Sequence, residues 1–222
     1  MYKEIIDFLK DKYVAIVGFG KEGKSTYNFL RKYLPNQRLV IIDGNKDLLD
    51  NNAYLNNDKN IELVLGDNYL DNLDKYDVII KSPGVRFKNI DISKFEDKIT
   101  SQLGLVLDYY KDNIIGITGT KGKSTTTSLI TKILKDQGID AYLLGNIGIP
   151  IFDNIDKMNE KSMMVIEMAA LQLEFVKNSP HIGIVLNLFE DIYIFLKKLY
   201  NLIEIKNKNY IIIDILRQNL KG

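Results

Sequence analysis

Two segments of this chain carry the same four residues, Gly-Lys-Ser-Thr, shortly after an apolar run. The first is VAIVGFGKEGKST at 14–26, and the second is IIGITGTKGKSTT at 114–126. In both, a β-branched run that favours a strand leads into a glycine-rich loop, and apolar residues at helical spacing follow. Strand, loop and helix in this order are the unit from which parallel sheets are built. The repetition therefore predicts an α/β fold with two such parts.

The second segment predicts a phosphate-binding loop. Its residues are Gly119, Thr120, Lys121, Gly122, Lys123, Ser124 and Thr125. The glycines let backbone N–H groups turn towards an anion, and the dipole of the helix that begins near Ser124 points at the same place. Lys123 adds a mobile positive charge, and Ser124 or Thr125 can hold a metal ion through its hydroxyl. An ordinary capped strand-to-helix turn is the alternative.

A carboxylate accompanies the second loop. The apolar strand predicted at 163–166 ends in Glu167, where a metal-ligating carboxylate beside a nucleotide triphosphate is expected. We therefore expect a nucleoside triphosphate such as ATP here, with a metal ion held by Glu167 and by Ser124 or Thr125. The strict spacing of two glycines before Lys-Ser occurs only in the first loop, because Ile117 replaces the leading glycine in the second. Glu167 nevertheless favours the second loop as the ATP site.

The first segment has a different pattern. Gly18, Gly20 and Gly23 form the dinucleotide-binding fingerprint, and Asp43 ends the next predicted strand about twenty residues further on. We expect a nucleotide site of the Rossmann kind at Gly18, Phe19 and Gly20, in which Asp43 accepts a hydrogen bond from a sugar hydroxyl.

Strands and helices alternate along the whole chain. Strands are predicted at 39–42, 61–65, 77–81, 99–102, 141–144, 163–167 and 182–188, and a helix at 103–111. Ser82, Pro83 and Gly84 follow one strand and are expected at the carboxyl edge of the sheet, where ligands bind; a plain turn is the alternative. The fold class is therefore α/β, with a Rossmann-like N-terminal parallel sheet at 1–98 and an incomplete P-loop α/β domain at 99–222.

The composition excludes several classes of protein. Thirty basic and 29 acidic residues give a net charge of +1, which argues against a nucleic-acid-binding protein. No cysteine is present, so disulfides and thiolate metal sites are excluded. No apolar run approaches the length needed to cross a membrane, and the first residues lack a signal-peptide pattern. We expect a soluble, cytoplasmic protein without membrane insertion.

These motifs are similar in order and spacing to those of the Mur ligases. The matching positions are Gly18-Phe19-Gly20, Asp43, Ser82-Pro83-Gly84, the loop 119–125, the run 145–148, Glu167, the run 172–174, the run 179–182 and Asn187-Leu188. The resemblance covers residues 12–191. It implies a first domain that holds a uridine nucleotide, a central domain that binds ATP and Mg²⁺, and a third domain that brings the amino acid.

The resemblance also implies a reaction. ATP phosphorylates the terminal carboxylate of UDP-N-acetylmuramoyl-L-alanine, and the amine of D-glutamate then attacks the acyl phosphate to form an amide. The implied substrate-binding residues are Gly18, Phe19, Gly20, Asp43, Ser82, Pro83, Gly84, Asn146 and Gln172. The resemblance also implies Mg²⁺ between Ser124 and Glu167, with Lys123 and Glu167 as catalytic residues. The lysine that is carbamoylated in the family corresponds to Lys206, although Lys208 is close, and Lys206 is the third expected catalytic residue.

The chain departs from the family pattern at several positions. Ile192 occupies a metal-ligand histidine position, and Ala169 and Ala170 replace a pair of serines. The chain also ends inside the expected central domain, so we expect a truncated ligase with weak or no activity. A nucleotide-binding module that does not ligate, and an NAD-binding Rossmann protein, are the two alternatives.

Overall fold

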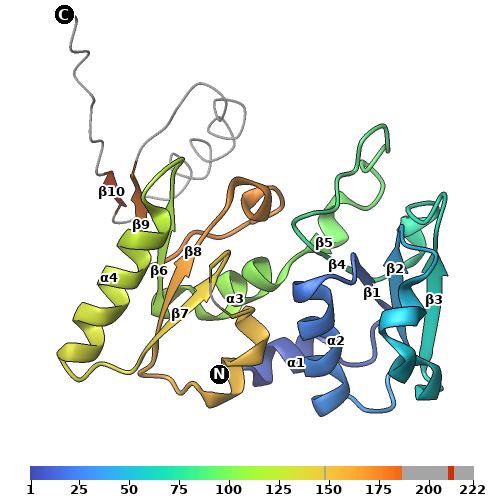
Figure 1. The fold of residues 1–222 in the computed structure, drawn as a ribbon, viewed down its shortest axis with the longest axis horizontal. Coiled ribbons are helices and arrows are strands. Elements are labelled where there is room, and N and C mark those ends of the chain that lie inside the picture. The colour runs from blue at the N-terminus through green and yellow to red at the C-terminus, as the bar shows by residue number, and fades with distance from the viewer. Residues whose placement is uncertain (148, 187–209, 213–222) are drawn as a thin grey trace, which may run out of the picture. The chain divides into compact units, whose positions relative to one another are not determined.

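The computed structural model of the protein describes residues 1–147, 149–186 and 210–212 (Figure 1). The chain divides into two compact units. One unit is Tyr2–Leu105, and the other is Val106–Gly222 together with Met1. Each unit has its own five-stranded sheet, and each is described by itself below.

The first unit is a parallel sheet with the strand order β3-β2-β1-β4-β5. Its elements are α1 (Lys3–Leu9), β1 (Val14–Val17), α2 (Lys21–Tyr33), β2 (Leu39–Asp43), β3 (Ile61–Leu65), β4 (Val78–Lys81) and β5 (Ile99–Thr100), with the short 3₁₀ helices η1 (Leu48–Asn51), η2 (Ala53–Asn57), η3 (Leu73–Lys75) and η4 (Glu96–Lys98). β1 is central, because Val14 pairs with Leu39 on one side and with Val78 on the other. Every residue of β1 is fully buried, as expected for a parallel strand covered on both faces.

The second unit is also a parallel sheet, with the order β10-β9-β6-β8-β7. Its elements are β6 (Ile114–Thr118), α4 (Lys123–Asp136), β7 (Ala141–Gly145), β8 (Met163–Glu167), β9 (Ile182–Val185) and β10 (Tyr210–Ile212), with η5 (Lys111–Asn113), η6 (Ile151–Asp153), η7 (Ile155–Lys157) and η8 (Ala170–Leu173). α4 lies along this sheet (Figure 1) and packs Ile130 and Leu134 against a core that includes Ile117, Val165 and Ile184.

The structure confirms the predicted α/β class with two parallel sheets. One predicted element is wrong at its end: Gln102 belongs to helix α3 (Gln102–Tyr110) and does not extend β5. The cause is local, since the Ser101 hydroxyl accepts the Gly104 N–H at 3.0 Å and so caps the start of the helix. The two units divide between Leu105 and Val106, and β5 pairs with β4 in the first sheet.

Across the described ranges, none of the helices combines the length and the apolar character needed to cross a bilayer.

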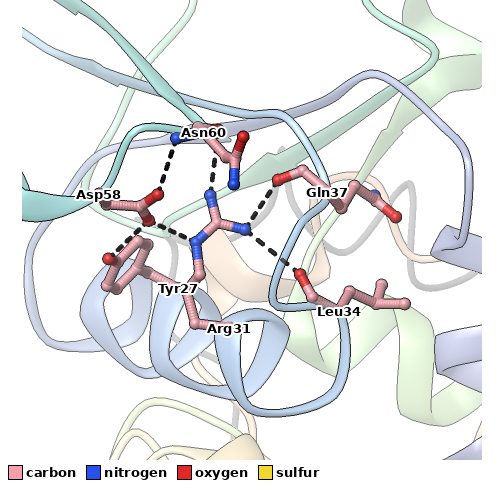
Figure 2. A network of polar contacts seen from close by, with 6 residues as sticks. All are labelled: Tyr27, Arg31, Leu34, Gln37, Asp58 and Asn60. Atoms are coloured by element: carbon pink, nitrogen blue, oxygen red, sulfur yellow. Dashed lines mark hydrogen bonds and ion pairs between the residues drawn. The ribbon is translucent and has the colours of Figure 1, made fainter.

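The end of the first unit where its strands begin is held by Arg31 (Figure 2). The Arg31 guanidinium forms an ion pair with Asp58 and donates to the carbonyl oxygens of Leu34 (3.3 Å), Gln37 (2.7 Å) and Asn60 (3.0 Å). These carbonyls lie at the end of α2, just before β2 and just before β3, respectively. One side chain from α2 therefore fixes the entry points of two strands.

Asp58 is the anionic partner in this network. It also accepts the Tyr27 hydroxyl at 2.9 Å and the Asn60 N–H at 2.9 Å. Burial opposes its charge, but the hydrogen bonds from Arg31, Asn60 and Tyr27 outweigh burial and lower the pKa of Asp58. Burial and the bond to Asp58 raise the pKa of Tyr27 to about 12, so its hydroxyl remains a donor at neutral pH.

We predict that Arg31→Leu destabilises the first unit by about 3 kcal/mol. The substitution leaves Asp58 without its counter-ion and three carbonyl oxygens without their donor. Urea unfolding followed by circular dichroism at pH 7 measures the effect. The matched control is Arg38→Leu, because the Arg38–Glu62 pair has side chains that are 68% and 34% exposed, and it should cost less than about 1 kcal/mol.

The Arg31→Leu effect should also depend on pH. The folded pKa of Asp58 is lower than its unfolded value of about 3.9, so the stabilisation by the charged pair is present above that value and is lost as the pH falls through the folded pKa. The difference between wild type and Arg31→Leu should therefore shrink below about pH 4. A difference that remains constant down to pH 3 would contradict this account of the network.

Candidate functional site

The second glycine loop lies between β6 and α4. β6 ends at Thr118 and α4 begins at Lys123, so residues 119–122 alone make the turn. Gly122 has a φ of 86°, in the left-handed region that favours glycine. The Lys123 ammonium donates to the carbonyl oxygens of Gly119 (2.8 Å) and Thr120 (3.2 Å). The loop therefore holds a positive charge and the first N–H groups of a helix at one place.

Glu167 lies at the same sheet edge as this loop. It ends β8, which pairs with β6 so that Ile117 is opposite Glu167. The Ser124 hydroxyl donates to one carboxylate oxygen of Glu167 at 2.8 Å, and the Asn146 side-chain amide donates to the other at 2.9 Å. The Asn146 backbone N–H also donates to the Glu167 carbonyl at 3.1 Å. The fold thus brings together Lys123, Ser124, Asn146 and Glu167.

The electrostatics of Glu167 favour a bound cation. The residue is only 1% exposed, and Ser124 and Asn146, which donate to its carboxylate, are neutral. A buried carboxylate is costly unless a positive charge compensates it. Carboxylate and hydroxyl oxygens suit Mg²⁺, which keeps several waters and phosphate oxygens as further ligands. This donor set fits Mg²⁺, and the described residues contain no group of three acidic or histidine side chains that would form a complete metal cage.

The structure describes two other predicted residues of this unit, Gln172 and Thr125. Gln172 lies in η8, where its side-chain oxygen accepts the Ala169 N–H at 2.9 Å and braces the turn after β8. Thr125 is exposed in the first turn of α4. Lys206, like Ile192 and Lys208, falls outside the described residues, so the expectation for a carbamoylated lysine has no structural counterpart here.

The first Gly-Lys-Ser-Thr sequence has a different local structure. α2 begins at Lys21, so Lys24, Ser25 and Thr26 lie inside the helix and not in the loop. Ser25 and Thr26 are 3% and 1% exposed, respectively, and the Thr26 hydroxyl donates to the Glu22 carbonyl at 2.9 Å. These hydroxyls are therefore directed into the protein, in contrast to the exposed Ser124 at the start of α4.

The glycine-rich loop after β1 contacts two other segments at the carboxyl edge of its sheet. The Phe19 N–H donates to the Asp43 carboxylate at 2.7 Å, and the Asn45 N–H donates to its other oxygen at 2.8 Å. The Ser82 hydroxyl donates to the Gly18 carbonyl at 2.7 Å. The turn that contains Pro83 and Gly84 is closed by the Val85 N–H, which donates to the Ser82 carbonyl at 3.1 Å. The predicted residues from β1, β2 and β4 therefore meet at one edge.

Gly23 is required for this loop to pack on its helix. A Cβ atom at Gly23 would lie 2.0 Å from the carbonyl oxygen of Gly18, whereas one at Gly20 would meet nothing within 4 Å. The third glycine of the fingerprint therefore allows close helix–strand packing, and the second leaves space beside the loop.

Sequence reasoning missed Gln102 as a support of this site. Its side-chain amide donates to the Thr26 hydroxyl at 3.0 Å and to the Glu22 carbonyl at 3.1 Å, and the residue is 2% exposed. These bonds tie the start of α3 to the first turns of α2. No local pattern signals them, because the partners are 76 and 80 residues apart in the sequence.

Comparison with known proteins places both units in one family. A profile of the Mur ligase MurD-like N-terminal domain matches residues 12–103, and a profile of the Mur ligase middle domain matches residues 117–208. The chain belongs to the Mur ligase family. The resemblance inferred from the motifs is therefore confirmed.

Curated relatives of this Mur ligase chain include two clostridial enzymes. The UDP-N-acetylmuramoylalanine–D-glutamate ligase of Clostridium botulinum (strain Okra / Type B1) is 36% identical over 191 residues, which are 84% of this chain and 41% of that enzyme. The ligase of the same name from Clostridium novyi (strain NT) is 37% identical with the same coverage. This Mur ligase chain thus spans about two fifths of the length of these relatives.

Among solved structures, the UDP-N-acetylmuramate:L-alanyl-gamma-D-glutamyl-meso-diaminopimelate ligase from Neisseria meningitides is 18% identical, with a TM-score of 0.48 over 87% of this Mur ligase chain and 68% of the other.

We predict that Gly23→Ala destabilises this Mur ligase chain and that Gly20→Ala has almost no effect on its stability. Gly23→Ala should cost about 3 kcal/mol, because the new methyl group would overlap the Gly18 carbonyl. Gly20→Ala should change stability by less than about 0.5 kcal/mol, because Gly20 is exposed and has a φ of −75°. Urea unfolding of the two variants tests this, and equal costs would show that the close contact does not determine the packing.

Proposed function

We propose that these two units are the substrate-binding and ATP-binding parts of an ADP-forming ligase of peptidoglycan precursor synthesis. The proposed reaction adds D-glutamate to UDP-N-acetylmuramoyl-L-alanine in the cytoplasm. The names of the relatives, together with the match of both units to Mur ligase domains, support this assignment. The observation that carries it in the structure is the pairing of Ser124 with the buried Glu167 carboxylate beside the Lys123 loop.

ATP is proposed to bind at the second loop. Gly119, Thr120, Lys121 and Gly122 would offer backbone N–H groups to its phosphates, and Lys123 would exchange its loop carbonyl partners for phosphate oxygens. Ser124 and Glu167 would hold Mg²⁺, which supplies charge neutralisation for phosphoryl transfer when it is bound. Asn146, with its two hydrogen bonds to Glu167, would keep that carboxylate oriented.

The chemistry proposed for this site is acyl activation. The terminal carboxylate of the UDP-linked substrate attacks the γ-phosphorus of ATP, and ADP leaves with the electrons of the broken P–O bond. The amine of D-glutamate then attacks the acyl phosphate, loses a proton and expels inorganic phosphate to form an amide. Because phosphoryl transfer depends mainly on positioning and charge stabilisation, Lys123 and Glu167 are the natural principal contributors.

The first unit is proposed to hold the UDP group. The loop of Gly18, Phe19 and Gly20 opens α2, whose N-terminus favours a diphosphate. Asp43 accepts two backbone N–H bonds, and its remaining lone pairs can accept a sugar hydroxyl. Ser82, Pro83 and Gly84 would form the opposite side of the same edge.

We predict that Lys123→Ala weakens ATP binding by about 1.5 to 3 kcal/mol and that Lys24→Ala does not. Lys123 is the first residue of α4 at the loop, whereas Lys24 lies one turn inside α2. Calorimetric titration with ATP and Mg²⁺ measures both. Loss of ATP binding in Lys24→Ala but not in Lys123→Ala would show that the two loops have been assigned in reverse.

The complete reaction is tested with UDP-N-acetylmuramoyl-L-alanine, D-glutamate, ATP and Mg²⁺, by measuring phosphate and amide product. For a polypeptide of these 222 residues we predict binding of ATP and of the UDP-linked substrate, with ligation far below the enzyme-typical range of about 1 to 1000 per second. Turnover within that range would show that these two units suffice. Tight binding of NAD without any response to the UDP-linked substrate would overturn the proposed function.

A further inference from the structure

The loops that follow β2 and β3 in the first unit are joined to each other. The Gly66 N–H donates to the Asp43 carbonyl at 2.9 Å, and the Lys46 ammonium pairs with Asp67 at 2.6 Å. These contacts place the residues after β3 beside the residues after β2, at the carboxyl edge where Asp43 lies.

An aromatic ring occupies this junction. A Cβ atom built at Gly44 would lie 3.2 to 3.6 Å from three carbon atoms of the Tyr69 ring, so the ring rests against Gly44. Tyr69 is half-buried, and burial together with the negative charge of Asp43 raises its pKa. The ring therefore lies against the residue that follows Asp43 and retains some exposed surface.

The strand order gives the direction of a nucleotide across this edge. In the order β3-β2-β1-β4-β5, the phosphates belong at the start of α2 after β1, and the sugar belongs at the acidic residue after β2. β3 lies on the far side of β2 from β1. A base that is attached to this sugar and directed away from the phosphates is therefore expected near the end of β3. Tyr69, which follows β3 and touches Gly44, lies in that direction.

We propose that Tyr69 stacks on the uracil ring of the UDP-linked substrate and so acts as a specificity residue for its base; this rests on the proposed function of the first unit. An aromatic ring beside a carboxylate offers a π surface for the base and an acceptor for its polar edge or its sugar. Glycine at position 44 suits this arrangement, because the Cβ atom of any other residue would lie only 3.2 Å from a carbon atom of the Tyr69 ring.

The test compares ligands with and without a base. UDP and inorganic diphosphate are titrated calorimetrically into wild type, Tyr69→Leu and Tyr69→Phe. Tyr69→Leu should bind UDP roughly 5- to 150-fold more weakly, the loss expected for one base–aromatic stack, while its affinity for diphosphate is unchanged. Tyr69→Phe should bind both as wild type does. The matched control Tyr33→Leu removes a ring that packs on Tyr2 and Phe29, away from the Gly44 loop, and should leave both affinities unchanged.

A spectroscopic measurement separates stacking from support of the loop. In the wild-type complex the uracil H5 and H6 NMR signals should shift upfield, and the shift should vanish in Tyr69→Leu and persist in Tyr69→Phe. If Tyr69→Leu does not fold, Gly44→Ala serves instead, because it displaces the ring and should weaken UDP binding alone.

Three results would overturn the proposal. If Tyr69→Leu weakens the binding of UDP and of diphosphate equally, the ring only supports the loop. If UDP binding is unchanged in this variant, the base lies elsewhere. If wild type binds neither UDP nor diphosphate, the nucleotide site itself is wrong, and the proposed function of the first unit fails with it.

Discussion

The pairing register of parallel strands is the constraint on which both sites depend. In the second unit, β6 and β8 pair so that Ile117 is opposite Glu167, and β7 pairs with β8 so that Gly145 is opposite the same residue. Because all three strands run in one direction, the loop after β6, Asn146 after β7 and the end of β8 emerge at one edge. A shift of one residue in the β6–β8 pairing would direct the Glu167 side chain to the other face of the sheet and away from Ser124.

The two Gly-Lys-Ser-Thr sequences show how one pattern gives two structures. After β1, the helix starts at Lys21, and three of the shared residues, Gly23, Ser25 and Thr26, are buried in its first turns. After β6, the helix starts only at Lys123, and the shared residues form its N-cap and first turn at the end of the loop. The start of the helix is decided by which glycine lies at the N-cap, Gly20 in one case and Gly122 in the other. Identical residues therefore face the interior at one site and an open edge at the other.

Much of this arrangement could be predicted from the sequence, because it depends on short-range patterns. Apolar runs followed by glycine or by Asp43 and Glu167 located the strands and the residues at their carboxyl ends. The contacts of Gln102 and Tyr69 could not be predicted in this way. Gln102 reaches Thr26 across 76 residues, and Tyr69 reaches Gly44 only because β2 and β3 are neighbours. Such contacts follow from the packing of elements, which single-sequence patterns do not encode.

The Arg31 network has a consequence for how the first unit tolerates sequence change. Arg31, Asp58 and the carbonyls of Leu34 and Gln37 secure the end of the unit at which the strands begin, whereas Phe19, Asp43 and Ser82 lie at the end where they finish. The anchoring contacts and the proposed ligand site therefore lie at opposite ends of one sheet. Substitutions at the end where the strands finish leave the Arg31 contacts at the other end in place, so residues there can change without loss of this anchoring network.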